Sequence, residues 1–282
     1  MKATNDNQTG PILVTGGTGR LGRRVVRRLR DAGCDVRVFA REAGKEEDGV
    51  RFVTGDLLSG TDVGAAVDGV ATIIHCAGST RGDEIATQNL VTAAARAGRP
   101  HLVYISVVGA ERIPVSGAID RMMFSYFDMK RKAEQVVAGS ELPWTTVRAT
   151  QVHGLILMVL EKMTKLPVVP VPSGVAFQPV DADEVAARLV ELALGQPSGL
   201  VPDFAGPRVY AMADLVRGYL GAVHRRRLLL PIRLPGEAAR ALRAGANLAP
   251  ERAVGTSTWE AFLADHLSQP TESLRGTATS PG

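Results

Sequence analysis

The stretch Ile12-Leu-Val-Thr-Gly-Gly-Thr-Gly-Arg-Leu-Gly22 decides the fold of this chain. An apolar run leads into glycines at positions 16, 19 and 22, and an arginine-rich helical segment follows directly. Between a strand and a helix, the first glycine permits a tight turn, the second lets the backbone approach a pyrophosphate, and the third allows close packing. The free N–H groups and dipole of the helix N-terminus favour the phosphate charge. This context favours a dinucleotide-binding turn over an ordinary glycine-rich βα turn.

Outward from this turn, short apolar runs alternate with helical segments. We expect strands at Ile12–Thr15, Val36–Ala40, Val50–Thr54, Ala71–Cys76, Leu102–Ser106 and Trp144–Arg148, and helices at Leu21–Ala32, Thr87–Ala97, Met129–Gly139, Asp183–Leu194 and Ala211–Val223. Runs rich in Val and Ile are typical of strands that are covered on both faces. The alternation predicts an α/β fold, a Rossmann-type doubly wound parallel sheet with a smaller C-terminal substrate-binding region.

Prolines and glycines become denser after Leu166, which predicts a looser, substrate-covering region packed on the core. We therefore divide the chain into a flexible N-terminus (1–10), a nucleotide-binding Rossmann core (11–152), the substrate-covering region (153–267) and a disordered tail (268–282) that is rich in Ser, Thr, Pro and Gly.

The composition narrows the class of protein. The 282 residues suffice for a large buried core, and the two cysteines, Cys34 and Cys76, lack metal-ligand spacing to a histidine. We therefore expect no disulfide framework, no metal site and a reducing, cytoplasmic location. The polar residues 1–10 and the shortness of every apolar run predict a soluble protein without a targeting segment.

The net charge of +4 is modest, and its most visible cluster is His224-Arg-Arg-Arg227. This cluster lacks interleaved aromatic residues that would stack bases, so it is interpreted as a solvated face and nucleic-acid binding is not expected. We expect a small-molecule substrate, no membrane partner, and a monomer or homodimer.

The second strand ends at Arg41, the position where an acidic residue would bind the ribose hydroxyls of NAD. A cation there would instead meet the 2′-phosphate of NADP, and Arg20 in the glycine turn could assist. A charge-assisted hydrogen bond contributes about 1.5–3 kcal/mol. The sequence therefore favours NADP(H), unless both arginines are only solvated surface groups.

Two further strand ends complete the expected cofactor site. Asp56 could accept from the adenine amino group, cap the following segment, or do both. The small-residue turn from His75 to Ser79 follows the fourth strand, at the edge where ligands sit in open α/β sheets; His75 itself is expected to be structural. The expected cofactor-binding residues are Gly16, Thr18, Gly19, Arg20, Leu21, Gly22, Arg41, Asp56, Leu57, Ala77 and Gly78.

With these residues placed, the chain resembles the atypical short-chain dehydrogenase/reductases, especially their NmrA-like NAD(P)H-binding branch. The resemblance rests on the stretches Thr15–Gly22, Gly55–Leu57, Tyr104–Gly109, Tyr126–Glu134, Leu142–Thr150, Phe177–Val185 and Trp259–Leu263. The glycine turn occurs in many families, whereas the run from Tyr126 to Glu134 followed by Arg148 is more specific. The stretch Val115–Ser125 departs from the pattern, since it is longer and richer in methionine.

In reductases of this family, a serine after the fifth strand and a Tyr-xxx-Lys pair on the next helix reduce or form a carbonyl. Ser106, Tyr126 and Lys130 stand at the matching places, so the resemblance implies that they are catalytic and that Lys130 also binds the cofactor. Many NmrA-like members lack the tyrosine and only sense the cofactor.

This trio suits hydride chemistry. A tyrosine hydroxyl can protonate the carbonyl oxygen as a general acid, but its reference pKa near 10 calls for a cation that stabilises the phenolate. Four residues along a helix place Lys130 on the same face as Tyr126, and Ser106 would orient the carbonyl oxygen. The same Tyr-xxx-Lys spacing also arises by chance.

The leading hypothesis is an NADPH-dependent oxidoreductase that reduces a small or medium apolar carbonyl or quinone-like substrate. His153 and the apolar residues after the sixth strand could line the substrate pocket, or they could belong to the core; the apolar ones are Val152, Leu155, Ile156, Met158 and Val159. The alternative is a non-catalytic NADP(H)-sensing regulatory protein of the NmrA type.

Overall fold

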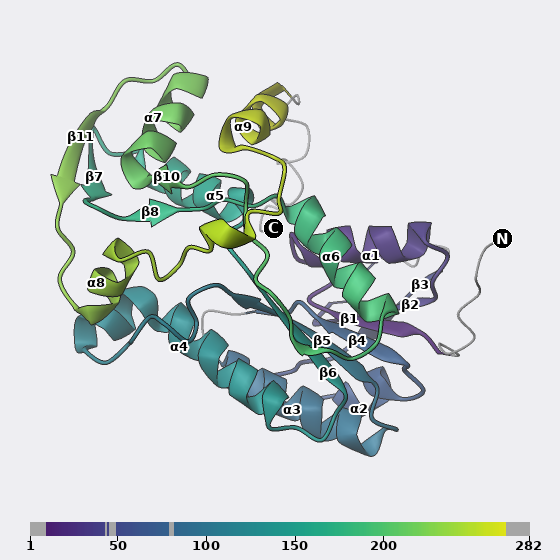
Figure 1. The fold of residues 1–282 in the computed structure, drawn as a ribbon. Helices are drawn as coiled ribbons and strands as arrows, with labels where there is room; N and C mark the ends of the chain where they lie inside the picture. The colour runs from purple at the N-terminus through teal and green to yellow at the C-terminus, as the bar shows by residue number, and fades with distance from the viewer. Residues whose placement is uncertain (1–9, 43, 45–48, 79–81, 269–282) are drawn as a thin grey trace, which may run out of the picture.

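The structure is a computed structural model that describes residues 10–42, 44, 49–78 and 82–268 (Figure 1). The predictions of a flexible N-terminus and a disordered tail therefore fall almost wholly outside the described residues.

A seven-stranded parallel sheet forms the centre of the molecule, in the order β3-β2-β1-β4-β5-β6-β9. Its strands are β1 (Ile12–Thr15), β2 (Val36–Ala40), β3 (Val50–Thr54), β4 (Thr72–His75), β5 (His101–Val107), β6 (Trp144–Ala149) and β9 (Gly199–Leu200). The first strand lies between β2 and β4, with Ile12 opposite both Val36 and Thr72. The strand order reverses here, which opens a crevice beyond the carboxyl ends of β1 and β4.

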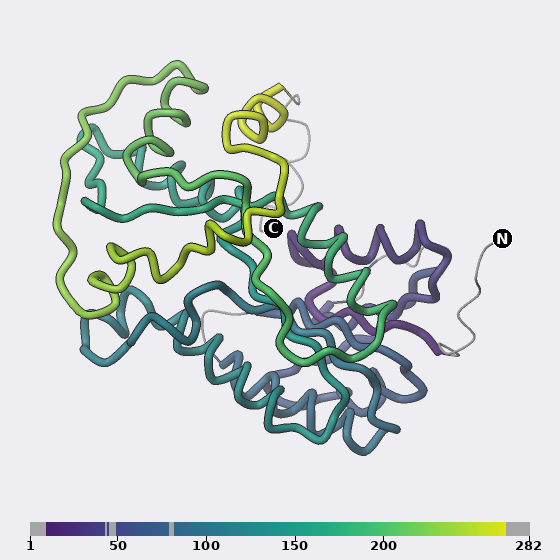
Figure 2. The backbone as a smooth tube through the Cα atoms, in the orientation of Figure 1, coloured from purple at the N-terminus to yellow at the C-terminus, as the bar shows by residue number. Residues whose placement is uncertain are grey.

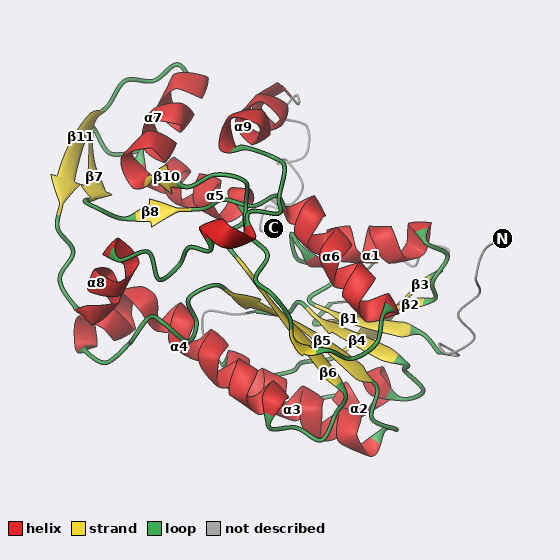
Figure 3. Ribbon diagram, in the orientation of Figure 1, coloured by secondary structure: helices red, strands yellow, loops and turns green. Residues whose placement is uncertain are grey.

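Helices cover both faces of this sheet (Figure 3). On one face lie α1 (Gly22–Asp31) and α6 (Ala182–Leu194), and on the other lie α2 (Val63–Val67), α3 (Asp83–Arg96) and α4 (Ala118–Ala138). Side chains alternate between the faces: Ile12 and Val14 pack in the α1–α6 core, whereas Leu13 packs in the opposite core. The predicted Rossmann-type doubly wound sheet is confirmed.

Helix α4 begins earlier than predicted. The sequence indicated a helix from Met129, but the helix begins at Ala118 and contains most of the methionine-rich stretch. Its first half has apolar side chains on its exposed side, including Ile119, Met122 and Met123, so the usual apolar–polar periodicity was hidden. One continuous helix therefore carries Tyr126 and Lys130 one turn apart.

A second lobe follows β6 and lies to one side of the sheet, in the orientation of Figure 1 (Figure 2). It consists of α5 (His153–Met163), α7 (Met212–Ala222), α8 (Glu237–Arg243), α9 (Trp259–Ser268), the strands β7 (Val168–Pro172), β8 (Ala176–Phe177), β10 (Tyr210–Ala211) and β11 (Leu228–Ile232), and the short 3-10 turn Pro250–Arg252. Two of the prolines that predicted a looser region, Pro170 and Pro172, lie in β7, which pairs with β11 alone among the described strands. A strand with one free edge tolerates proline, because no ladder donor is needed there.

Part of the region assigned to the substrate cover returns to the sheet. Val185 and Leu189 of α6 share one core cluster with α1, and Arg24 Nε lies 2.9 Å from Asp183 Oδ2 across that contact. Strand β9 then pairs in parallel with β6. Residues 182–200 therefore lie in the Rossmann layers and not in the second lobe.

Candidate functional site

The three glycines of the first turn are needed for different steric reasons. Gly16 has a φ of +68°, and a Cβ there would lie 2.6 Å from the backbone nitrogen of Ala77. A Cβ on Gly22 would collide with the carbonyl oxygen of Gly16, so α1 packs directly on the turn. A Cβ on Gly19 would meet only that same oxygen, at 3.1 Å. Gly16 and Gly22 are thus required by the protein itself, whereas Gly19 borders open space.

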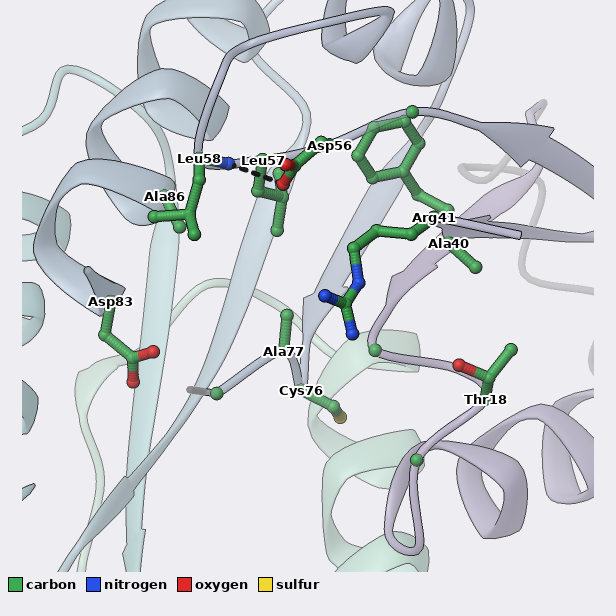
Figure 4. Close-up of a pocket in the computed structure, with 15 residues that line it drawn as sticks. Thr18, Ala40, Arg41, Asp56, Leu57, Leu58, Cys76, Ala77, Asp83 and Ala86 are labelled. Atoms are coloured by element: carbon green, nitrogen blue, oxygen red, sulfur yellow. Dashed lines mark hydrogen bonds between the residues drawn. The ribbon is translucent and has the colours of Figure 1, made fainter. Parts of the chain in front are cut away.

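That space is a pocket of about 330 Å³ at the carboxyl ends of β1 to β4 (Figure 4). Eight of the expected cofactor residues line it: Gly16, Thr18, Gly19, Arg41, Asp56, Leu57, Ala77 and Gly78. The lining is completed by residues that the sequence analysis did not assign to the site: Phe39, Ala40, Gly55, Leu58, Cys76, Asp83 and Ala86. Figure 4 shows the guanidinium of Arg41 extending from the end of β2 into this pocket.

Four expected residues do not line the pocket, and one of them, Lys130, lies buried just behind its lining. Arg20 Nη1 donates to the carbonyl oxygen of Gly154, at 3.0 Å, so this guanidinium ties the glycine turn to α5 in place of facing Arg41. Leu21 packs against the α1–α6 core, and Gly22 serves the contact between turn and helix. Only the tertiary position of α5, which the sequence did not predict as a helix, decides the direction of Arg20.

Asp56 caps the loop that follows β3. Its Oδ1 accepts from the backbone N–H of Leu58, at 2.9 Å. Asn89 of α3 donates to the carbonyl oxygens of Leu57 and Leu58, at 2.8 and 3.1 Å, and so holds this loop against the helix. The sequence analysis missed Asn89, because a polar residue in a helix gives no sign of the loop it will meet.

His75 is a structural residue beneath the pocket. Its side chain is buried, with Nδ1 2.6 Å from Thr15 Oγ1 and Nε2 3.1 Å from Thr87 Oγ1. Burial, helped by the nearby Lys130 charge, lowers the pKa of His75 to about 3. The imidazole is therefore neutral at physiological pH and links β1, β4 and α3.

Lys130 is buried next to the far end of the pocket. Its Nζ lies 3.2 Å from Tyr104 Oη, 3.4 Å from the Ile105 carbonyl oxygen and 3.5 Å from Asp83 Oδ2. Burial alone would lower the pKa of Lys130, but Tyr104, Tyr126 and Asp83 together raise it above its usual value. The amine is therefore a charged ammonium.

Tyr126 and Ser106, the two other expected catalytic residues, lie near this ammonium. Tyr126 is 40% exposed, and the centroid of its ring lies 6.0 Å from Lys130 Nζ. Ser106 directly follows Ile105, whose carbonyl contacts that Nζ; its Oγ is buried without a hydrogen-bond partner among the described residues. The fold thus brings Lys130 next to Tyr126 and next to the end of β5 that carries Ser106.

An ion pair fixes α4 against β6. Arg148 Nε and Nη2 donate to the two carboxylate oxygens of Glu134, at 2.9 and 2.7 Å, and Arg148 Nη1 lies 3.1 Å from Glu111 Oε1. A two-pronged contact of this kind restrains orientation as well as distance. It gives a physical reason for the pattern of Tyr126–Glu134 followed by Arg148.

The other candidate residues belong to the second lobe. His153 is buried, its ring stacks on Phe262 with centroids 4.8 Å apart, and its Nδ1 lies 3.9 Å from Asp181 Oδ2. Ile156 is also core, whereas Leu155 and Val159 are about two-fifths exposed. Within the described part of the chain, no group of His, Cys, Asp and Glu is arranged to hold a metal ion, and no helix is long and apolar enough to cross a membrane.

Comparison with known proteins agrees with this geometry. The profile of the NAD(P)H-binding family matches residues 16–192, which begin at the first glycine of the turn. The chain belongs to this NAD(P)H-binding family. The resemblance to the NmrA-like NAD(P)H-binding proteins that the sequence indicated is thereby confirmed, as is the expectation of a nicotinamide cofactor in its coarser form, NAD(P)H.

The proteins whose sequences are similar to this chain have names that describe different functions. The chain is 36% identical over 141 residues to a (4-alkanoyl-5-oxo-2,5-dihydrofuran-3-yl)methyl phosphate reductase of Streptomyces griseus, with 49% of this chain and 46% of that protein covered. It is 28% identical over 175 residues to the human decarboxylating sterol-4-alpha-carboxylate 3-dehydrogenase (55% and 47%), and 27% identical over 177 residues to the chloroplastic protein TIC 62 of Pisum sativum (51% and 33%). The chain thus spans about a third to about a half of the length of these relatives.

Solved structures share the fold over most of the chain. An NADPH-dependent quinone oxidoreductase of Escherichia coli, complexed with NADPH, superposes with a TM-score of 0.75, covering 90% of this chain and 99% of that one. A nucleoside-diphosphate-sugar epimerase of Staphylococcus aureus gives 0.72 with the same coverage. Both are 16% identical to this chain, so they show the common fold alone.

Proposed function

We propose that this protein is an NADPH-dependent oxidoreductase that reduces a small or medium apolar carbonyl or quinone-like substrate by hydride transfer. The observation that carries the proposal is the buried Lys130 ammonium, which lies beside Tyr126 and beside the cofactor pocket. Its Nζ would be 3.6 Å from a Cβ placed on Gly78, a residue of the pocket lining. A sensor of the cofactor would need the pocket but no such pair.

The pocket lining fits a dinucleotide. A left-handed glycine and the N-terminus of α1 offer backbone N–H groups to a pyrophosphate, and Asp56 has a second carboxylate oxygen for the adenine amino group. When bound, the cofactor supplies the hydride. Tyr126 then protonates the substrate oxygen, Lys130 stabilises the resulting phenolate and binds the nicotinamide ribose, and Ser106 donates from its Oγ to the same substrate oxygen.

The choice of NADP over NAD rests on Arg41. We expect Arg41→Ala to weaken NADPH binding by roughly ten- to a hundredfold while changing NADH affinity by less than about threefold, because a charged hydrogen bond to the 2′-phosphate is lost. Isothermal titration with both cofactors measures this.

Arg20→Ala is the matched control, since it removes an equal charge whose guanidinium is directed at Gly154. We expect it to leave the ratio of the two affinities unchanged. Equal dissociation constants for NADPH and NADH in the parent protein would contradict the proposed preference.

The enzymatic function is tested by following NADPH oxidation at 340 nm, the usual nicotinamide absorbance, against a panel of apolar aldehydes, ketones and quinones. Turnover of any member supports the oxidoreductase. Tight NADPH binding with no turnover across the panel would favour the alternative, a non-catalytic NADP(H)-sensing regulator.

The proposal includes a reducing, cytoplasmic setting and a monomer or homodimer. Cys34 and Cys76 are both free thiols, which supports the setting. Sedimentation of the purified chain would decide the oligomeric state.

A further inference from the structure

A buried pair of opposite charges closes one end of the cofactor pocket. Lys130 of α4 and Asp83, the first residue of α3, are each 5% exposed in their side chains, and Nζ lies 3.5 Å from Oδ2. Asp83 lines the pocket itself. A Cβ on Gly78 would be 3.6 Å from Lys130 Nζ and 3.7 Å from Asp83 Oδ2, so the pair lies directly beneath the backbone that borders the pocket.

Three titratable groups beside the pair carry no charge at neutral pH. Burial lowers the pKa of His75 to about 3, and burial raises the pKa of Cys76 and of Tyr104 to about 12 each. Among the described residues, Asp83 and Lys130 are thus the buried charged groups at this end of the pocket. Because buried charges are only weakly screened, a change in either charge alters the electrostatic potential in the adjoining pocket.

We propose that Asp83 is a positioning residue that balances the charge of Lys130 and thereby sets the relative affinity of the site for oxidised and reduced nicotinamide cofactor. The inference rests on the proposed function, which places the nicotinamide ring beside Lys130. The oxidised ring carries a positive charge and the reduced ring is neutral. A balanced pair discriminates little between them, whereas an unbalanced ammonium repels the oxidised ring and an unbalanced carboxylate attracts it.

Two single variants and their double variant, made in the full chain, test this proposal. The dissociation constants of NADP⁺ and NADPH are measured for each by titration calorimetry at pH 7. We expect Asp83→Asn to raise the ratio of the NADP⁺ constant to the NADPH constant roughly tenfold, and Lys130→Met to lower it roughly tenfold, the scale of one charge–charge interaction at low screening. The double variant should return to within about threefold of the parent ratio.

Two features separate this role from a merely structural one. Loss of packing would weaken both cofactors alike, whereas the proposal requires opposite shifts in the two single variants and their cancellation in the double. Tyr104→Phe removes a hydrogen bond from Lys130 without changing charge, so it should leave the ratio at the parent value. If Asp83→Asn does not fold, Lys130→Met and the neutral double variant still give the downward shift and its reversal.

Unchanged ratios in folded single variants that bind both cofactors would overturn the inference and leave the proposed function standing. A parent chain that binds neither cofactor would overturn the proposed function as well. None of these measurements requires a known substrate.

Discussion

Tyr126→Phe is expected to lower turnover by about 10² or more, the usual scale for loss of a general acid, while NADPH affinity changes by less than about twofold. The substitution removes only the hydroxyl and keeps the ring, at a residue that is 40% exposed in the folded chain. Stability should therefore be unaffected. Steady-state rates with a substrate found in the carbonyl and quinone panel measure the loss, and calorimetry measures the affinity.

Tyr219→Phe is the matched control. Tyr219 belongs to α7 and packs in the core of the second lobe, so its hydroxyl should be irrelevant to turnover. Should Tyr126→Phe react at the parent rate with an active substrate, the proton would come from water or from another donor, and the assigned role of Tyr126 would be wrong.

Gly19→Val is expected to weaken NADPH binding by more than about a hundredfold while the protein stays folded. Gly19 lines the pocket, and a Cβ there meets only the Gly16 carbonyl oxygen, at 3.1 Å. The added Cβ is tight against this one backbone oxygen, and the rest of the side chain occupies the space where a pyrophosphate would lie against the backbone. Titration calorimetry measures affinity, and thermal unfolding checks that the fold survives.

The other glycines of the turn would not serve this purpose. Gly16 needs its left-handed φ, and a Cβ on Gly22 collides with backbone, so substitutions there disturb folding and binding together. Gly64→Ala, on α2 with nothing within 4 Å of its Cβ position, is the control for a harmless added methyl group. Parent-like NADPH affinity in Gly19→Val would show that the pyrophosphate site lies elsewhere.

Much of the Rossmann layer could be predicted because its signals are local. Strands β1, β2 and β3 were predicted with the bounds that the structure shows, since each is a short run rich in β-branched or aromatic residues. The glycine turn could be predicted equally well, because its three glycines lie within seven residues of one another in the sequence. The short strands of the second lobe were missed, since β8 and β10 have two residues each and form only by pairing with one another.

In the candidate site, too, some residues could be located from local sequence signals and others could not. Arg41 and Asp56 could be located from sequence because strand ends put side chains at known places. The helix predicted from Met129 left Tyr126 outside, so the family resemblance, and not the helical pattern, paired Tyr126 with Lys130. The direction of Arg20 could not, because its acceptor, the Gly154 carbonyl, is 134 residues away along the chain.

The sequence by itself determined that this chain builds a nucleotide-binding sheet and places a tyrosine four residues before a lysine. Only the tertiary structure decided that Lys130 would be buried as an ammonium against Asp83. The physical reason is that hydrophobic patterning specifies which residues enter a core, whereas the balance of a buried charge depends on which distant side chain the packing of α3 against α4 brings within a few ångströms.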